Sequence, residues 1–113
     1  DEYFGSASNF AQDFKERYGY APPYQSAESA AAVLVYKNAF ERAGELDKKA
    51  VRDALQKTDM MTFYGPVRFD DTGKNIAKPM VLYQVQDGEY KVVAPTEYAS
   101  ADVQYPFPDW SER

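Results

Sequence analysis

The stretch that decides the fold is "QSAESAAAVLVYKNAFERAG", residues 25–44. Residues 30–36 are apolar without interruption, and polar side chains return only from Lys37 onward. A helix that is apolar on all sides is expected to be buried all round. The alanines at 30–32 would let another backbone or a sheet approach closely, and Gly44 is expected to end the helix in the left-handed conformation. This pattern predicts a long central helix whose first half is covered on every side.

A helix is also predicted before this stretch, in "SASNFAQDFKERYGYAPPY", residues 6–24. Either Ser6 or Ser8 can cap its N-terminus, and Gly19 fits the position just after its last turn. Its apolar face, which we expect to pack in the core, consists of Phe10, Phe14 and Tyr18.

A third helix is predicted after it, in "LDKKAVRDALQK", residues 46–57. Asp47 is the expected N-cap, and Leu46 and Val51 can form a hydrophobic staple. The predicted buried stripe of this helix is Ala50, Val51, Ala54 and Leu55.

Beyond Asp59 the pattern favours strands. Val67 and Phe69 alternate with Arg68, as in a short half-exposed strand, and "DDTGKN" at 70–75 has the composition of a turn. Asp87-Gly88 lies between two alternating runs and predicts a two-residue type I′ hairpin turn. The predicted cross-strand pairs are Val85 with Tyr90, Tyr83 with Val92, and Val81 with Ala94, with Gln84 and Lys91 on the polar face. We therefore expect three helices followed by a short strand and an antiparallel β-hairpin.

Composition excludes several kinds of protein. The chain has 113 residues, a net charge of −5, no cysteine and no histidine. It therefore lacks a disulfide framework, Ser-His-Asp or Cys-His machinery and the commonest zinc ligands. The negative charge disfavours nucleic acid as a partner. No apolar run is long enough for a membrane span, and the start of the chain does not resemble a signal peptide, so we expect a soluble chain that is either mature or trimmed.

The adjacent carboxylates Asp70 and Asp71 allow two interpretations. They could act as a general acid and base or bind a hard cation, and a hydrolase that works with carboxylates alone would depend on them. The spacing of oxygens in "DDTGKN" does not match a calcium loop, and Asp and Gly are typical of turn geometry. We expect a turn.

The ten tyrosines support a different hypothesis. The pattern assigns core positions to Tyr18, Tyr83 and Tyr90. It assigns none to the four other tyrosines Tyr20, Tyr24, Tyr64 and Tyr105. Exposed aromatic side chains bind sugars and peptides. The chain could therefore be a free-standing α+β interaction module that uses exposed tyrosines.

The order of motifs resembles a known family. The matching features, in chain order, are Phe14, Tyr18, Gly19 and Pro22, the alanine-rich helix ending in Ala39 and residues 41–44, "VRDAL" at 51–55, Thr62, Gly65-Pro66, Phe69-Asp70, Gly73, Gln84, Asp87-Gly88, Val93-Ala94-Pro95, and "PFPDWSER" at 106–113. This layout resembles the C-terminal part of a type I periplasmic solute-binding protein of the branched-chain amino-acid (Leu/Ile/Val) ABC transporter family.

The resemblance implies an α/β fold of two lobes, of which this chain is a fragment that would not bind ligand alone. Residues 1–58 would be the helical part of one lobe, 59–95 hinge-region strands and the hairpin, and 96–113 an irregular tail. The implied role is non-enzymatic, without cofactor or metal. The implied partners are a small solute and a membrane permease, outside the cytoplasm, with a lipid anchor as one option for the full-length protein.

The resemblance also suggests a ligand class and a site. Many members carry an aromatic-Asp pair where this chain has Ala30 and Ala31, and the form here is closer to members that take aromatic acids, amides or other small carboxylates. The residues expected nearest the cleft are Tyr24, Gln25 and Ser26, at a helix start whose free amides favour anions, and Phe63 and Tyr64 near the hinge. The apolar residues 30–36 also predict that the fragment self-associates.

Overall fold

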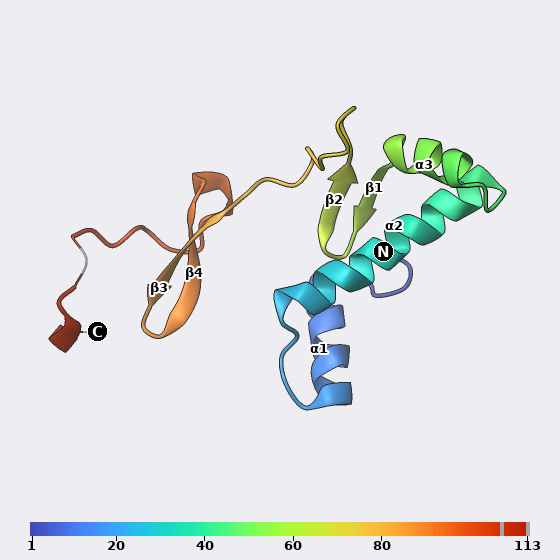
Figure 1. Ribbon diagram of the computed structural model, residues 1–113. Coiled ribbons are helices and arrows are strands. Elements are labelled where there is room, and N and C mark those ends of the chain that lie inside the picture. Colours follow the sequence, from blue (N-terminus) through green and yellow to red (C-terminus); the bar gives the residue numbers. More distant parts are fainter. Residues whose placement is uncertain (107, 113) are drawn as a thin grey trace. The chain divides into compact units, whose positions relative to one another are not determined.

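A computed structural model describes residues 1–106 and 108–112 of the protein (Figure 1). Three helices are followed by two antiparallel strand pairs, so the predicted α/β class is confirmed. The chain divides into two compact units, Asp1–Lys78 and Pro79–Arg113. Two residues of the tail motif noted above, Phe107 and Arg113, lie outside the described residues.

Helix α1 (Ala7–Tyr18) is bounded by the predicted signals. Ser6 is the N-cap, and its Oγ accepts a hydrogen bond from the N–H of Asn9 at 3.1 Å. Gly19 follows in the left-handed conformation and donates its N–H to the carbonyl of Lys15 at 2.8 Å. Phe10 is buried and Phe14 is half-buried, but Tyr18 is 54% exposed. The prediction that Tyr18 lies on the core face is therefore wrong.

Helix α2 (Tyr24–Ala43) ends at Gly44, as predicted. One of its sides is buried, through Ala31, Leu34, Val35 and Ala39. The opposite side is not, because Val33, Tyr36 and Phe40 are 65%, 52% and 41% exposed. The expectation of burial all round is therefore wrong: in the described part of the first unit, α1, α3 and the first strand pair leave this side of α2 uncovered. None of the described helices, α2 included, is both long and apolar enough to span a bilayer.

Helix α3 (Lys48–Gln56) begins at its predicted cap. The carboxylate of Asp47 accepts hydrogen bonds from the N–H groups of Lys49 and Ala50, at 3.0 and 2.9 Å. Val51 is buried, but Leu46 is 84% exposed, so the predicted staple between them is not formed. α3 packs against α2.

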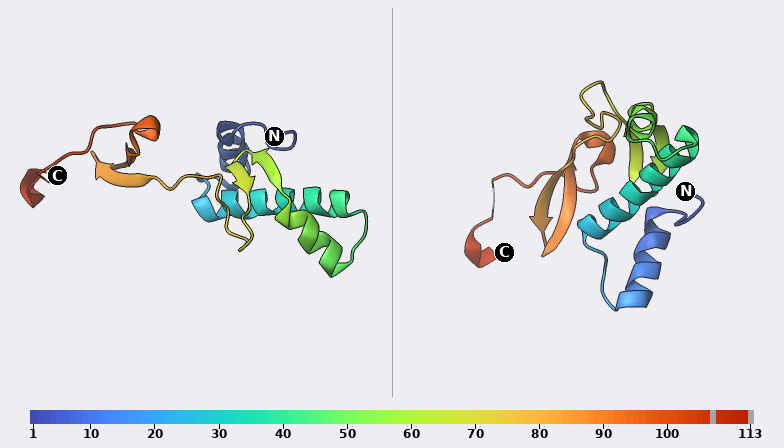
Figure 2. Two further views of the ribbon diagram at one scale, coloured as in Figure 1. Left: turned by 90° about the horizontal axis from the view of Figure 1, so that it is seen from above. Right: turned by 45° about the vertical axis from the view of Figure 1, so that its right-hand side comes forward.

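Strands β1 (Asp59–Thr62) and β2 (Gly65–Arg68) form an antiparallel pair joined by a turn at Phe63 and Tyr64. The sequence predicts the strand around Val67 but not β1, its partner. Figure 2 shows α1 and this strand pair beside the same long helix, α2. One core cluster of the unit joins these three elements and contains the buried residues Phe10, Ala31, Leu34 and Phe63.

The second unit is built on the hairpin of β3 (Leu82–Gln86) and β4 (Glu89–Ala94). Asp87 and Gly88 have φ values of 53° and 76°, as a type I′ turn requires. The predicted pairs of Val85 with Tyr90 and of Tyr83 with Val92 are confirmed. The third predicted pair is wrong, because a register shift pairs Ala94 with Leu82 and not with Val81.

The tail of the second unit folds back on the hairpin and covers its polar face. It contains two short 3-10 helices, η1 (Thr96–Tyr98) and η2 (Trp110–Glu112). The side-chain amide of Gln84 donates to the carbonyl of Gln104 at 3.0 Å and accepts from its N–H at 2.9 Å. Gln86 is buried and donates to the carbonyl of Asp102 at 2.8 Å.

The other face of the hairpin is open within this unit. Tyr83, Val85 and Tyr90 are 58%, 53% and 80% exposed. The prediction that Tyr83 and Tyr90 lie on a core face is therefore wrong here. Amide side chains can hydrogen-bond the backbone of the tail and apolar side chains cannot, so the polar face is the one that the tail covers.

Candidate ligand-binding site

The five residues predicted for the site come from two places in the first unit. Tyr24, Gln25 and Ser26 form the first turn of α2, and Phe63 and Tyr64 form the turn between β1 and β2.

The first turn of α2 presents backbone N–H groups. Its N-cap is Pro23, and in the described part of the chain no side chain caps this end. The N–H of Ser26 donates to the carbonyl of Pro23 at 3.0 Å, and no acidic residue lies in the first turn. Tyr24 is 67% exposed, Gln25 is exposed and Ser26 is half-buried. Such an end carries positive partial charge and suits an anion.

Phe63 lies in the core. Its ring stacks on Phe10 with centroids 4.4 Å apart and meets the edge of Phe4 at 5.0 Å. Its N–H donates to the carboxylate of Asp1 at 2.8 Å. Phe63 is 8% exposed, so its ring belongs to the packing beneath the predicted site and not to its surface.

Tyr64 is partly buried and packs against the same cluster, as do Ala27 and Ala30 of α2. Its N–H donates to Oγ1 of Thr62 at 3.2 Å, and that hydroxyl donates to the carbonyl of Gly65 at 2.9 Å. Both predicted groups therefore border one core cluster, the turn through Phe63 and Tyr64 and the start of α2 through Ala27, which follows directly after Ser26.

Lys78 also belongs to this region, although no motif in the sequence predicts it as a site residue. Its Nζ lies 3.0 Å from the centroid of the Tyr64 ring, a cation–π contact. Partial burial lowers the pKa of Lys78, and the carboxylate of Glu28 acts in the opposite direction. No local pattern marks this lysine, because its contacts come from the β1–β2 turn and from α2. The arrangement offers one cation, one aromatic ring and the start of a helix.

Asp70 belongs to a hydrogen-bonded turn at residues 70–74. Oδ1 of Asp70 accepts hydrogen bonds from the N–H and the hydroxyl of Thr72, at 2.9 and 2.7 Å, and from the N–H of Lys74 at 3.0 Å. The hydroxyl of Thr72 is the main reason why the pKa of Asp70 lies below its usual value, followed by the N–H of Lys74. The turn interpretation is confirmed. Within residues 1–106 and 108–112, no three acidic side chains gather to hold a metal ion.

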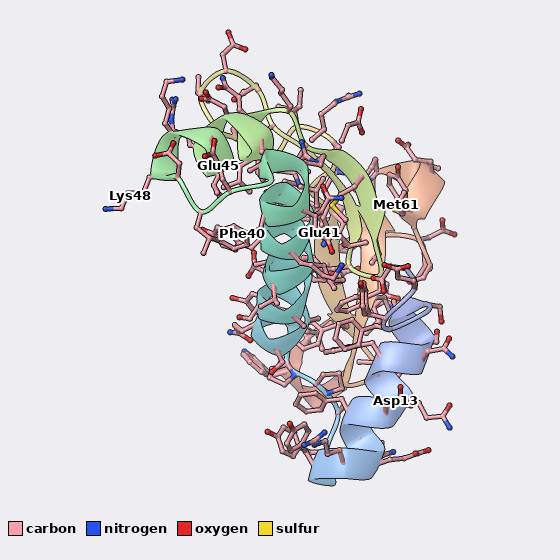
Figure 3. The ribbon with its side chains drawn as sticks, turned by 90° about the vertical axis from the view of Figure 1, so that its right-hand side faces the viewer. Asp13, Phe40, Glu41, Glu45, Lys48 and Met61 are labelled. Atoms are coloured by element: carbon pink, nitrogen blue, oxygen red, sulfur yellow. The ribbon has the colours of Figure 1, made fainter. Side chains whose placement is uncertain are left out.

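A shallow hollow of about 330 Å³ lies at the other end of α2, lined by Phe40, Glu41, Gly44, Glu45 and Leu46. Figure 3 shows Phe40 on the side of α2 away from Met61 of β1. Phe40 lies 16 positions after Tyr24 in the same helix, about 24 Å along it at 1.5 Å per residue. The hollow is therefore separate from the predicted ligand residues.

The sequence was compared with models of known protein families. The sequence matches the model of the family described as "Periplasmic binding protein" over residues 2–89. This region contains α1, α2, α3, β1, β2 and β3, and thus all five predicted ligand residues and Lys78. Because the match covers most of the chain, the protein belongs to the periplasmic binding protein family.

Proposed function

We propose that this chain is part of the substrate-binding component of an ABC importer for amino acids or related small carboxylates, and that it carries out no catalysis. The family match over residues 2–89 is the observation that carries the proposal, since a solute-binding role outside the cytoplasm is the general property of the family. The importer role and the ligand class go beyond that match. They are supported by the resemblance to branched-chain amino-acid receptors.

In this proposal the solute lies against the first turn of α2. An anionic group would accept hydrogen bonds from its N–H groups, with Tyr24, Gln25 and Ser26 around it. Tyr64 would border the same space and Phe63 would support it from the core. The exposed Tyr24 and the uncapped helix start support this choice. Alanine at positions 30 and 31 favours an aromatic acid, an amide or another small carboxylate over a branched-chain amino acid.

The domain boundaries follow from the same proposal. Residues 1–58 would form the helical part of one lobe of a two-lobed receptor, 59–95 would form the hinge-region strands and the hairpin, and 96–113 would form the irregular C-terminal tail. Ligand would close the two lobes, and the closed form would dock on a membrane permease. The receptor would work in the periplasm or on the outer side of the membrane, where a lipid anchor could retain it.

The test uses the receptor encoded by the complete reading frame around this chain. A panel of amino acids, aromatic acids and amides is screened by thermal shift, and any hit is titrated by calorimetry. Tyr24→Ala should weaken binding of the hit at least tenfold, about 1.4 kcal/mol, while Tyr36→Ala, an exposed tyrosine elsewhere on α2, should not. Equal effects of the two substitutions would contradict the placement of the site.

The isolated 113-residue chain provides a second test. We expect it to bind none of these solutes, because the other lobe would supply most of the contacts. Micromolar binding of a branched-chain amino acid to this chain alone would overturn the proposal that it is a fragment.

The alternative function is a free-standing α+β module that binds a partner through exposed tyrosines. The exposure of Tyr24, Tyr90 and Tyr105, at 67%, 80% and 90%, favours it. The reading frame upstream of Asp1 separates the two candidates. A secretory or lipoprotein signal followed by a few hundred residues of α/β sequence supports the receptor, and a stop codon supports the module.

A further inference from the structure

The hairpin of the second unit has one open edge. Gln86 and Glu89 flank the two-residue turn and exchange backbone hydrogen bonds, so the next pair, Val85 and Tyr90, points its N–H and C=O groups outward. By the same alternation, Tyr83 and Val92 also point outward.

The two edges differ in what occupies them. The carbonyl of Val92 accepts from the N–H of Ser100 at 2.8 Å, and its N–H donates to the hydroxyl of Ser100 at 3.2 Å. The tail therefore closes the edge of β4. In the part of the chain that the structure describes, no group hydrogen-bonds the outward N–H and C=O of Tyr83 and Val85, so the edge of β3 is open.

The open edge also lacks the features that normally protect one. Edge strands are usually blocked by charged residues, proline or a bulge. From Tyr83 to Gln86 β3 carries no charge and no proline, and the register shift of this strand lies just before, between Leu82 and Tyr83, whereas β4 carries Glu89 and Lys91. A two-stranded hairpin is marginally stable alone, and a third or fourth strand stabilises it.

We propose that β3 pairs antiparallel with β3 of a second copy of this chain, about a two-fold axis at Gln84. In this register Tyr83 lies opposite the partner's Val85, and Val85 lies opposite the partner's Tyr83. Both pairs exchange their outward N–H and C=O groups, which gives four backbone hydrogen bonds and satisfies every open group of the two residues. The inference depends on the hairpin alone and not on the proposed function.

The sequence of β3 supports a second copy as the occupant. Both cross-strand pairs join an aromatic and a β-branched residue, the combination that already joins Val85 to Tyr90 within the hairpin. The axis brings Gln84 opposite the partner's Gln84, both uncharged. The chain has a net charge of −5, yet this register brings no like charges together. A symmetric interface needs a surface that is complementary to itself, and β3 meets this condition.

The experiment is sedimentation equilibrium of the 113-residue chain over a wide concentration range. We expect a reversible monomer–dimer equilibrium. Val85→Pro removes one outward N–H and no hydrogen bond between β3 and β4, and it should weaken dimerisation at least tenfold. Tyr90→Lys is the matched control, because it changes the same exposed face on the other strand and leaves the edge intact. Tyr90→Lys should change the dissociation constant of the dimer less than threefold.

Amide hydrogen exchange gives a second measurement that does not depend on the proline variant. The N–H groups of Tyr83 and Val85 should exchange more slowly as the concentration of the wild-type chain rises, while that of Tyr90 should not change. A chain that stays monomeric, or a dimer with unprotected Tyr83 and Val85, would overturn the proposal. So would a dimer that Val33→Lys, on the exposed side of α2, dissociates while Val85→Pro does not.

Discussion

The carboxylate of Asp1 accepts a hydrogen bond from the backbone N–H of Phe63 at 2.8 Å, across 62 positions of sequence. Its other oxygen accepts from the N–H groups of Tyr3 and Phe4, at 3.0 and 2.8 Å. These bonds hold the ring of Phe4 against Phe10 and Phe63, with centroids 5.4 and 5.0 Å away. One carboxylate thus connects residues 1–5 to the β1–β2 turn, on which the predicted ligand residue Tyr64 lies.

Asp1→Ala should therefore destabilise the first unit. The change leaves the partly buried N–H of Phe63 without its acceptor, which costs about 1–3 kcal/mol in free energy of unfolding. Urea denaturation of the 113-residue chain measures this loss in free energy of unfolding. Glu2→Ala is the control, because it removes an exposed carboxylate next to Asp1. Equal losses of unfolding free energy in the two variants would mean that the hydrogen bond from Phe63 to Asp1 does not stabilise the unit.

The contact between Arg42 and Thr58 should couple α2 to the end of α3. Nη2 of Arg42 donates to Oγ1 of Thr58 at 2.8 Å, and Thr58 is 2% exposed. A double-mutant cycle of Thr58→Val and Arg42→Ala should give a coupling energy of about 1 kcal/mol, because the contact is a charge-assisted hydrogen bond at a partly buried site. Additive effects in urea denaturation would show that the two residues act independently.

The features that the sequence predicts correctly are local ones. Two helix caps, Ser6 and Asp47, bond to N–H groups no more than three residues away. The hairpin turn needs only the positive φ values of Asp87 and Gly88. The turn at Asp70 belongs to the same class, because its carboxylate bonds only to Thr72 and Lys74.

The features that the sequence misses depend on distant partners. Strand β1 lacks the alternating pattern of a strand and becomes one by pairing with β2. The exposed side of α2 follows from which elements lie beside it, and the hydrophobic pattern of residues 30–36 cannot give that information. The open apolar face of the hairpin has a similar cause, since the tail covers the face with the glutamines.

The candidate site also combines local features, which the sequence predicts, with tertiary contacts, which it does not. The start of α2 is predicted because Pro22 and Pro23 end the preceding segment, and its uncapped N–H groups follow from the helix boundary. Lys78 is missed because its contact with Tyr64 is tertiary. The capping pattern of Asp1 with Tyr3 and Phe4 could have been recognised, but its bond to Phe63 could not.

Acid should weaken the Asp70 turn in a predictable range of pH. Hydrogen bonds from the Thr72 hydroxyl and from the N–H groups of Lys74 and Thr72 hold the pKa of Asp70 below its ordinary value of 3.8. The folded state therefore favours the ionised carboxylate. Its contribution to stability is fully present above pH 3.8 and is lost as the pH falls through the lower folded pKa. Carbon-13 NMR titration of the carboxyl group measures that pKa.

Two substitutions at Thr72 test the cause of this shift. Thr72→Val removes the hydroxyl that lies 2.7 Å from Oδ1 of Asp70, so the pKa of Asp70 should rise toward 3.8. Thr72→Ser keeps the hydroxyl and should leave the pKa of Asp70 low. If the valine variant titrates like the wild type, the hydroxyl is not the main cause.

The substitution Gln86→Glu should weaken the packing of the tail on the hairpin of the second unit. Its Nε2 donates both to the carbonyl of Asp102 and to Oε1 of Gln84, at 2.8 and 2.7 Å. Gln86→Glu replaces this donor by a carboxylate that faces two acceptors, so the tail should open more often. We expect the N–H of Gln104, which donates to Gln84 at 2.9 Å, to exchange at least about tenfold faster, as a loss of one to two hydrogen bonds implies. Gln104→Glu is the matched control, because only the backbone of Gln104 takes part in these bonds. Exchange at Gln104 that is equally fast in both variants would show that added charge, and not the lost donor, releases the tail.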